Sequence, residues 1–349
     1  MISVEMKYGK RTIEANFRED NLMGILRGSF PPPPTPEEEI REVERSLREP
    51  IGSKSLDEIA KPGQKVVIMA SDITRPVPSW KILPTLVNKL NSCGISDTDI
   101  TIMFGVGIHR SHTEDERRYL VGDELYKRVK CKDSVGDPYI YVGKSALGTP
   151  YYVNSIVAAS DLLICTGNIE YHWFAGYSGG AKAILPGASN YETIRSSHSR
   201  ISHPGTGTGI INGNPIRSDI DGILKFLKID FIVNVVIDDQ KRILRSFAGH
   251  PIDAHRAGCA YLDSIYGKKI NHQADVVVIS CGGYPKDINL YQAQKALDNG
   301  NHAVREGGTI IMIGSCSEGY GDKTFEDWVY SASSPQDILN RIKTDFQLG

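Results

Sequence analysis

Short, continuous apolar runs separated by helical segments are the feature that most limits what this chain can fold into. The run Lys65-Val-Val-Ile-Met-Ala70 is typical of a strand that is covered on both faces. Amphipathic helical segments are predicted at 81–92 and 114–120. Further apolar runs lie at 100–104, 162–165, 231–237, 276–280 and 309–314. The alternation predicts an α/β protein with mostly parallel sheets flanked by helices, whose site lies just past the carboxyl ends of strands.

The length of 349 residues suggests two domains or one large one. We expect an N-terminal α/β domain over residues 1–270 and a C-terminal α/β domain over 271–349. A helix predicted at 251–266 ends before this boundary, and a new strand–loop–helix–strand pattern begins at Asp275. A strand or hairpin is predicted at 3–13. With two domains, the active site is expected in the cleft between them.

Composition argues against several classes of protein. Forty Lys and Arg residues against 42 Asp and Glu residues give a formal net charge of −2, which does not support a nucleic-acid binder or a polybasic membrane binder. The sequence has no apolar run of about 18 residues, and its N-terminus lacks the apolar centre of a signal peptide. We therefore expect a cytoplasmic protein. The six cysteines are too far apart in sequence for a zinc ribbon or a redox pair, and we expect small buried thiols.

Two polar loops follow the first two predicted strands. The first contains Asp72 and Arg75, and the arginine lies between a threonine and two prolines, where its planar guanidinium could clamp a carboxylate or a phosphate. The alternative is a surface ion pair between these two residues. The second loop, Gly105-Val-Gly-Ile-His109-Arg110, lacks the third glycine of a dinucleotide-binding fingerprint. His109 is a candidate general base or a structural histidine.

The segment 167–187 is the densest in chemically useful residues. It contains His172, the glycine-rich turn Ser178-Gly179-Gly180, and Lys182. It resembles a phosphate-binding loop only weakly, because alanines flank the lysine where glycine and Ser or Thr are needed. We therefore discount a nucleoside triphosphatase.

Two further groups of candidates lie downstream. His198 has no histidine partner at the spacing of a helical zinc site, so any metal that it binds must take its other ligands from elsewhere, including from a cofactor. After the strand that ends at Ser280, a predicted helix carries Tyr291, Gln292 and Lys295. The last two share a helix face by their spacing, which is equally compatible with an ordinary solvated surface.

These motifs, in this order, resemble the nickel-pincer lactate racemase family over most of the chain. The matching motifs are Asp72-Ile-Thr-Arg75, Gly107-Ile-His109-Arg110, the block from His172 through Ser178-Gly-Gly-Ala-Lys182 to Pro186-Gly187, His198, and Tyr291-Gln292-Ala-Gln-Lys295. Each motif alone is weak, but five in register are specific. Family members continue past the position of Gly349, so the resemblance implies a C-terminal domain that is incomplete relative to the family.

The resemblance implies a role for each candidate. The expected cofactor is a nickel-pincer nucleotide, a pyridinium mononucleotide whose two sulfur-bearing arms and one ring carbon hold the nickel ion. Lys182 matches its covalent attachment point, and His198 matches the protein ligand of nickel. The remaining positions that match are the acid/base histidines His109 and His172, the substrate-binding residues Arg75, Tyr291, Gln292 and Lys295, and the cofactor-binding residues Asp72, Ser178, Gly179 and Gly180.

The implied reaction is racemisation or epimerisation of a small 2-hydroxy acid, lactate or a relative. The hydrogen on the carbinol carbon is hardly acidic, because the neighbouring carboxylate is already negative. It leaves more easily as hydride, provided that a base removes the hydroxyl proton, and a pyridinium-type ring accepts hydride. The product of this step is a 2-keto acid intermediate. The two histidines then act as bases for the hydroxyl groups of the two enantiomers. The resemblance also implies cofactor-biosynthesis proteins as partners.

Two other functions remain open from the residues. One is a nucleotide-dependent enzyme that binds phosphate with its glycine-rich loops. The other is a non-catalytic protein that binds a hydroxy acid or the cofactor. Such a carrier would need Lys182 and His198, but it would not need both His109 and His172.

Overall fold

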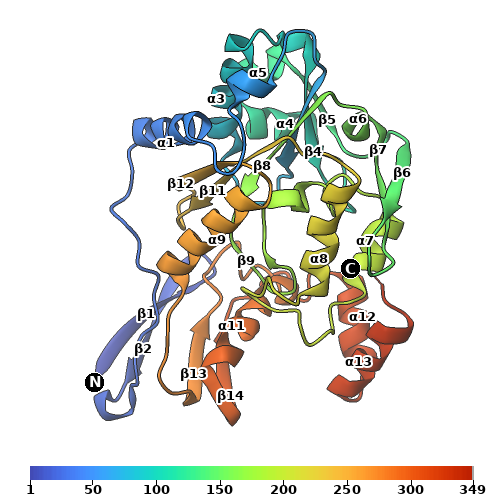
Figure 1. The fold of residues 1–349 in the computed structure, drawn as a ribbon. Coiled ribbons are helices and arrows are strands. Elements are labelled where there is room, and N and C mark those ends of the chain that lie inside the picture. The colour runs from blue at the N-terminus through green and yellow to red at the C-terminus, as the bar shows by residue number, and fades with distance from the viewer. Residues whose placement is uncertain (348–349) are drawn as a thin grey trace. The chain divides into compact units, whose positions relative to one another are not determined.

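The computed structural model describes residues 1–347, which divide into two compact units (Figure 1). The larger unit is Ser29–Tyr266, and the smaller one combines Met1–Gly28 with the chain from Gly267 onward. The break after Tyr266 lies close to the expected boundary, but the first 28 residues belong with the C-terminal part. The reason is local: the turn of the N-terminal hairpin bonds to that part, since the Tyr284 N–H donates to the Gly9 carbonyl oxygen at 2.8 Å.

The larger unit is built on a six-stranded sheet with the strand order β12-β11-β8-β3-β4-β5. Five neighbouring strands are parallel, and β12 pairs antiparallel with β11 at the edge. The strands are β3 (Val66–Ser71), β4 (Ile100–Gly105), β5 (Lys130–Asp133), β8 (Leu162–Asn168), β11 (Phe231–Ile237) and β12 (Ile243–Gly249). The α/β prediction with a mostly parallel sheet is confirmed.

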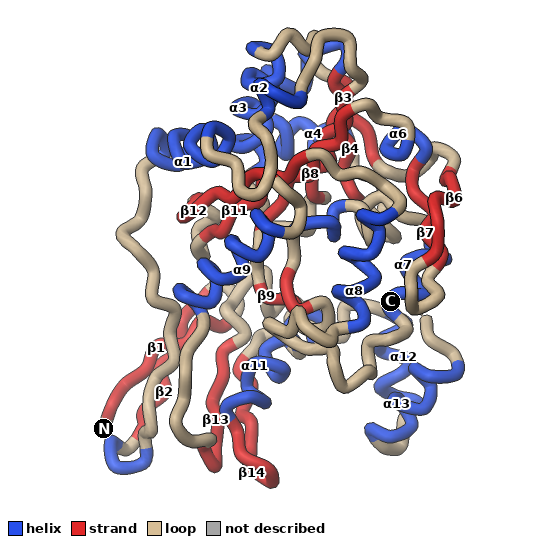
Figure 2. Tube along the Cα trace, in the orientation of Figure 1, coloured by secondary structure: helices blue, strands red, loops and turns tan. Residues whose placement is uncertain are grey.

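Helices surround this sheet (Figure 2). They are α1 (Pro36–Arg48), α2 (Leu56–Ile59), α3 (Ser79–Ser92), α4 (Glu114–Val121), α5 (Asp123–Arg128), α6 (Ser155–Ala158), α7 (Tyr191–His198), α8 (Pro215–Gly222) and α9 (Asp253–Tyr266). Short strand pairs join β6 (Tyr139–Lys144) to β7 (Pro150–Asn154) and β9 (Tyr171–His172) to β10 (Gly176–Tyr177). Helix α1 begins with a capping box between Thr35 and Glu38.

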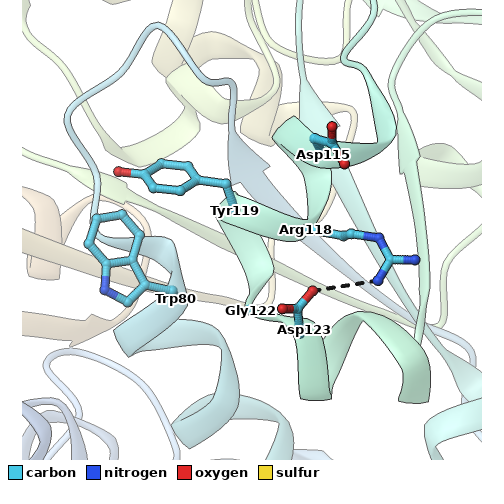
Figure 3. A pocket seen from close by; sticks show the side chains of 6 residues that line it. All are labelled: Trp80, Asp115, Arg118, Tyr119, Gly122 and Asp123. Atoms are coloured by element: carbon cyan, nitrogen blue, oxygen red, sulfur yellow. Dashed lines mark hydrogen bonds and ion pairs between the residues drawn. The ribbon is translucent and has the colours of Figure 1, made fainter.

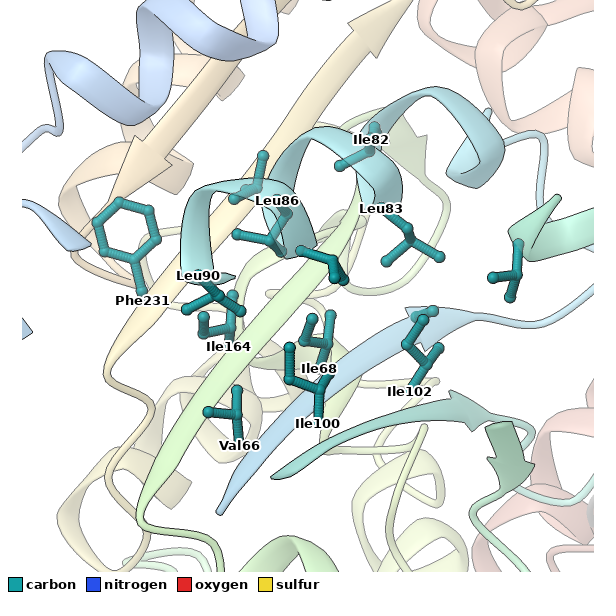
Figure 4. Close-up of a cluster of buried hydrophobic side chains, with 14 of the residues drawn as sticks. Val66, Ile68, Ile82, Leu83, Leu86, Leu90, Ile100, Ile102, Ile164 and Phe231 are labelled. Atoms are coloured by element: carbon teal, nitrogen blue, oxygen red, sulfur yellow. The ribbon is translucent and has the colours of Figure 1, made fainter. Parts of the chain in front are cut away.

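The core lies between α3 and the strands beneath it (Figure 4). Leu83, Leu86 and Leu90 recur at helical spacing on α3 and are fully buried. They pack with residues of β3 and β4 such as Ile68 and Ile102, which are also fully buried. This packing fixes the strands, and therefore it also fixes the starting points of the loops that leave their carboxyl ends.

The smaller unit contains the antiparallel hairpin β1 (Ile2–Tyr8) and β2 (Arg11–Phe17) and the parallel pair β13 (Ala274–Ser280) and β14 (Val304–Ile313). Its helices are α10 (Leu290–Ala293), α11 (Lys295–Ala303), α12 (Lys323–Ser331) and α13 (Pro335–Thr344). Across residues 1–347, none of the helices combines the length and the apolar character that crossing a membrane requires. The six cysteines form no disulfide; Cys165 and Cys259 are buried, and the other four are partly exposed.

Candidate active site

The loops that follow β3 and β4 bring Asp72 and His109 together. These strands are parallel neighbours in the sheet, so their carboxyl ends open onto the same edge. The Asp72 Oδ2 and His109 Nδ1 atoms are 3.2 Å apart; the Asp72 side chain is 5% exposed and the His109 side chain 43% exposed. The structure therefore joins a buried carboxylate to an accessible imidazole, two candidates separated by 37 residues in sequence.

Asp72 remains ionised although it is buried. Burial raises the pKa of its carboxyl group, but the hydrogen bond with His109, the nearby Arg75 guanidinium and the Thr74 side chain outweigh burial and lower the pKa to about 2. The backbone N–H of Thr74 also donates to Asp72 Oδ1 at 2.7 Å, and the Arg75 N–H donates to the Asp72 carbonyl oxygen at 3.1 Å. These bonds form a tight turn that aims the carboxylate at His109.

Phe174 lies at the centre of a second group of predicted residues. Its ring centroid is 4.4 Å from that of His172 and 4.9 Å from that of His198, in edge-to-face geometry. The Lys182 Nζ atom is 5.9 Å from the same ring centroid. Phe174 itself is 8% exposed. The β9–β10 turn, the turn carrying Lys182, and helix α7 therefore meet at one aromatic side chain.

His198 is the last residue of α7, and it is neutral at physiological pH. Burial lowers the pKa of its imidazole to about 3, and the positive charges of Lys182 and Arg75 act in the same direction, against a weaker opposing effect of the Ile194 carbonyl. Arg75 thus acts electrostatically on both Asp72 and His198. The Gly107 N–H also donates to the Gly187 carbonyl oxygen at 3.1 Å, which joins the loop of His109 to the segment that follows Lys182. The two groups of predicted residues therefore lie in one region of the larger unit.

The glycine-rich turn positions Lys182. Gly179 and Gly180 have φ angles of +80° and +62°, which side chains other than glycine rarely adopt. The Gly180 N–H donates to Asn234 Oδ1 on β11 at 2.7 Å, and a Cβ atom on Gly179 would lie 2.9 Å from the same oxygen. Lys182 lies within the short 3₁₀ helix Gly180–Ala183 that follows. Both glycines are therefore required by the backbone conformation of the turn.

The Ser178 hydroxyl group is engaged within the protein. It donates to the Asn168 carbonyl oxygen at 2.8 Å and accepts from the Glu170 N–H at 2.9 Å. These two bonds fasten the turn to the end of β8. The geometry gives this hydroxyl a structural function, while its predicted role in cofactor binding remains a prediction.

Sequence reasoning missed the buried side chains that bind the backbone of residues 175–178. Arg217 donates to the carbonyl oxygens of Ala175 and Tyr177, and His255 Nε2 donates to that of Ser178 at 2.8 Å. Both side chains are fully or almost fully buried, and burial lowers the pKa of each. Nothing in the local sequence marked them, because their partners are backbone atoms about 40 and 77 residues away.

Tyr291, Gln292 and Lys295 lie in the smaller unit. The predicted single helix is divided into α10 and α11, yet the Lys295 Nζ atom donates to Gln292 Oε1 at 2.6 Å. The same Nζ atom lies 6.0 Å from the Tyr291 ring centroid. The three predicted substrate-binding residues therefore form one local cluster, although Gln292 and Lys295 lie in two successive helices and not on one face of a single helix.

A surface hollow is lined by residues of α3, of α4 and of the start of α5 (Figure 3). Its lining consists of Trp80, Asp115, Arg118, Tyr119, Gly122 and Asp123. Arg118 and Asp123 form an ion pair across it, with 3.5 Å between the charged atoms. It contains none of the predicted site residues.

Metal binding by the protein alone has no support in the part of the chain that the structure describes, residues 1–347. No group of three or more His, Cys, Asp or Glu side chains there is arranged to hold an ion.

Family models match both units of the chain. Residues 8–209 match the lactate racemase N-terminal domain, and residues 269–347 match the lactate racemase C-terminal domain. With the α/β fold and its histidine-containing loops, these matches define an enzyme of the racemase class. The chain belongs to the lactate racemase family.

Individual relatives agree with this assignment. The lactate racemases of Thermoanaerobacterium thermosaccharolyticum and Lactiplantibacillus plantarum are each 36% identical to this chain, and each alignment covers 98% of this chain and 81% of the relative. The solved lactate racemase apoprotein from T. thermosaccharolyticum superimposes with a TM-score of 0.90 at 34% identity, over 98% of this chain and 81% of that one. A Thermotoga maritima protein with a TM-score of 0.56 and 20% identity, over 75% of this chain and 66% of that one, shares the fold alone.

Proposed function

We propose that this enzyme racemises lactate or a closely related 2-hydroxy acid, with His109 and His172 as its acid/base pair. The relatives named lactate racemase support the substrate class. The observation that carries the proposal is the convergence of candidates from separate loops: His172 and His198 both contact Phe174, and Arg75 acts electrostatically on both Asp72 and His198. A reaction at a single carbon requires such convergence.

The residues present fit the nickel-pincer nucleotide that the family resemblance implies. His198 is neutral, so one of its two ring nitrogens carries a lone pair that a metal ion can use, and its Nδ1 atom is buried without a hydrogen-bond partner within residues 1–347. Lys182 is near enough to lower the pKa of His198 and supplies the amine for covalent attachment. When bound, the cofactor would supply a hydride acceptor for the carbinol carbon.

His109 is suited to take the hydroxyl proton of the substrate. Asp72 is ionised and therefore accepts a hydrogen bond from the Nδ1–H group of His109, which leaves the lone pair on Nε2. Because 43% of the His109 side chain is exposed, a substrate can reach it. We assign Asp72 the role of orienting this base, as a carboxylate does for a catalytic imidazole.

His172 is held in the opposite tautomer to His109. Its Nδ1 atom accepts a hydrogen bond from the Ala175 N–H at 3.3 Å, so the neutral ring carries its proton on Nε2. In this form His172 donates a hydrogen bond from Nε2–H to the substrate oxygen. To act as the acid, His172 must first take a second proton on Nδ1, which replaces the bond from Ala175; as an imidazolium it gives its Nε2 proton to the ketone oxygen, while His109 keeps the proton that it took from the hydroxyl group. For the opposite enantiomer, His172, now neutral with a free Nε2, takes the hydroxyl proton and protonated His109 returns one.

Arg75 is proposed to bind the substrate carboxylate, because a guanidinium group pairs with a carboxylate through two parallel hydrogen bonds. Tyr291, Gln292 and Lys295 are proposed as further substrate-binding residues. For these three, the support is the family motif and the local cluster that they form. A Lys295→Ala substitution should then raise KM for the hydroxy acid.

A chiral assay tests the proposed function. Protein produced together with the cofactor-building enzymes should convert either enantiomer of lactate to the racemic mixture. His109→Ala and His172→Ala should each reduce turnover by about 100-fold or more while the cofactor stays attached. Failure to racemise lactate and larger 2-hydroxy acids with a fully loaded protein would contradict the proposal and leave a binding function as the alternative.

A further inference from the structure

A buried histidine, His112, stands apart from the residues assigned so far. Its side chain is 1% exposed, and that of its partner Asp133 is 3% exposed. His112 Nδ1 lies 2.6 Å from Asp133 Oδ1, and the His112 backbone N–H donates to Asp133 Oδ2 at 3.1 Å. Arg117 also donates to Asp133 Oδ2, at 2.7 Å. The ring packs edge-to-face on Phe104, with 5.2 Å between centroids.

The hydrogen bonds of His112 fix its tautomer. The Ile73 backbone N–H donates to His112 Nε2 at 3.0 Å. An N–H group can only donate, so Nε2 must carry the lone pair. The ring proton is therefore on Nδ1, and Asp133 accepts a hydrogen bond from this Nδ1–H group. Both nitrogens of this buried ring are therefore used, and each has one possible role.

The hydrogen bond between Ile73 and His112 matters because Ile73 is next to Asp72 in the sequence. Ile73 lies between Asp72, which binds His109, and Thr74, which fixes the Asp72 carboxylate. His112 is in the same loop as His109, three residues later. The bond from Ile73 to His112 therefore joins the loop after β3 to the loop after β4, and these are the two loops that carry Asp72 and His109.

Three adjacent strand ends contribute to this arrangement. Asp133 is the last residue of β5, which pairs with β4, and β4 pairs with β3. The chain of contacts runs from Asp133 through His112 and the Ile73 amide to Asp72 and His109. The rigid sheet thus controls where the accessible imidazole is held.

We propose that His112, oriented by Asp133, is a positioning residue that holds Asp72 against His109. Its consequence for catalysis rests on the proposed function, in which His109 is a base. The contacts themselves lie in the larger unit and do not depend on any bound group.

Three substitutions separate positioning from general structural support. Phe in place of His112 keeps an aromatic ring but removes both bonds. Gln has an oxygen near the position of Nε2 and so retains an acceptor for the Ile73 N–H, whereas Asn has its polar atoms near the position of Nδ1 and retains only the Asp133 side. His272→Phe, at an exposed histidine of the smaller unit, is the control.

The first readout needs no cofactor. In the apoprotein, carboxyl-carbon NMR should give an Asp72 pKa of about 2 for the unsubstituted protein. The pKa of Asp72 should be higher in His112→Phe and His112→Asn, because the turn then no longer holds the carboxylate near His109 and Arg75. His112→Gln should restore the lower value. In loaded enzyme, His112→Phe should lower kcat by roughly 10- to 100-fold with little change in KM, since a displaced base slows the chemical step.

An unchanged Asp72 titration and an unchanged kcat in His112→Phe would overturn the proposal, even if that variant were less stable. If His112→Phe does not fold, Gln and Asn variants that behave alike would overturn it in the same way. Should the unsubstituted loaded enzyme fail to racemise any hydroxy acid, the proposed function fails, while the apoprotein titration still decides whether His112 positions Asp72.

Discussion

Replacing Asp72 with Asn tests the electrostatic account of the site. In the folded protein the pKa of this carboxyl group is about 2, against an ordinary value of 3.8. Each whole pKa step between the folded and unfolded states corresponds to about 1.4 kcal/mol, so the lowered pKa stabilises the folded protein by roughly 2 kcal/mol at neutral pH. The Asp72 side chain is 5% exposed, so solvent screens this contribution little.

The dependence on pH has a definite sign. A carboxyl group whose pKa is lowered by folding stabilises the protein above its unfolded pKa, and this stabilisation is lost as the pH falls through the folded value. The stabilisation by Asp72 should therefore be complete above about pH 4 and disappear towards pH 2. Asp72→Asn should reduce the free energy of unfolding by up to roughly 2 kcal/mol at pH 7, and the difference from the unsubstituted protein should narrow below pH 4.

Urea unfolding of the apoprotein at pH 7 and at pH 3 measures this difference. Asp115→Asn, at an exposed residue of α4 in the same unit, is the control and should change stability by less than about 0.5 kcal/mol. Equal stability of Asp72→Asn and the unsubstituted protein at pH 7 would refute the reasoning. A direct titration of Asp72 at or above 3.8 would refute it as well.

Two substitutions test the core and the loop that supports the site. Leu86→Ala removes a fully buried side chain from the contact between α3 and the sheet and should cost about 2–5 kcal/mol in urea unfolding, whereas Leu147→Ala, at a 45% exposed residue, should be nearly neutral. Gly187→Ala places a Cβ atom 2.2 Å from the Ala183 carbonyl oxygen, so it should destabilise the protein by about 1–3 kcal/mol, measured as a lower midpoint of thermal unfolding. Gly24→Ala, with open space around its Cα, is the control, and a Gly187 variant as stable as that control would contradict the close packing described here.

Much of the fold could be predicted because the responsible signals are local. The run at 66–70 and the helix at 81–92 have the periodicities of a buried strand and a half-buried helix, and the structure contains β3 and α3 there. The assignment of the first 28 residues to the smaller unit could not be predicted. It depends on bonds such as that from Tyr284 to Gly9, which join positions 275 residues apart.

In the candidate site, too, some residues could be predicted from the sequence and others could not. The candidates Asp72, His109 and Lys182 were recognisable from residue type and from their position after strands. The side chains that orient them were not, because His112 and Arg217 act through backbone atoms of distant segments. A buried polar residue whose partner is a backbone group leaves no motif in the sequence. Only the folded structure shows it.

The attachment of a cofactor to Lys182 is the most direct test of the central claim that separate loops form one nickel-pincer site. Intact-mass spectrometry should show a mass above that of the polypeptide when the protein is produced with the cofactor-building enzymes, and peptide mapping should locate the added mass on Lys182. The addition should vanish in Lys182→Ala and persist in Lys144→Ala, at an exposed lysine of β6. A protein that racemises lactate with no mass added at Lys182, or with the addition on another residue, would contradict the account.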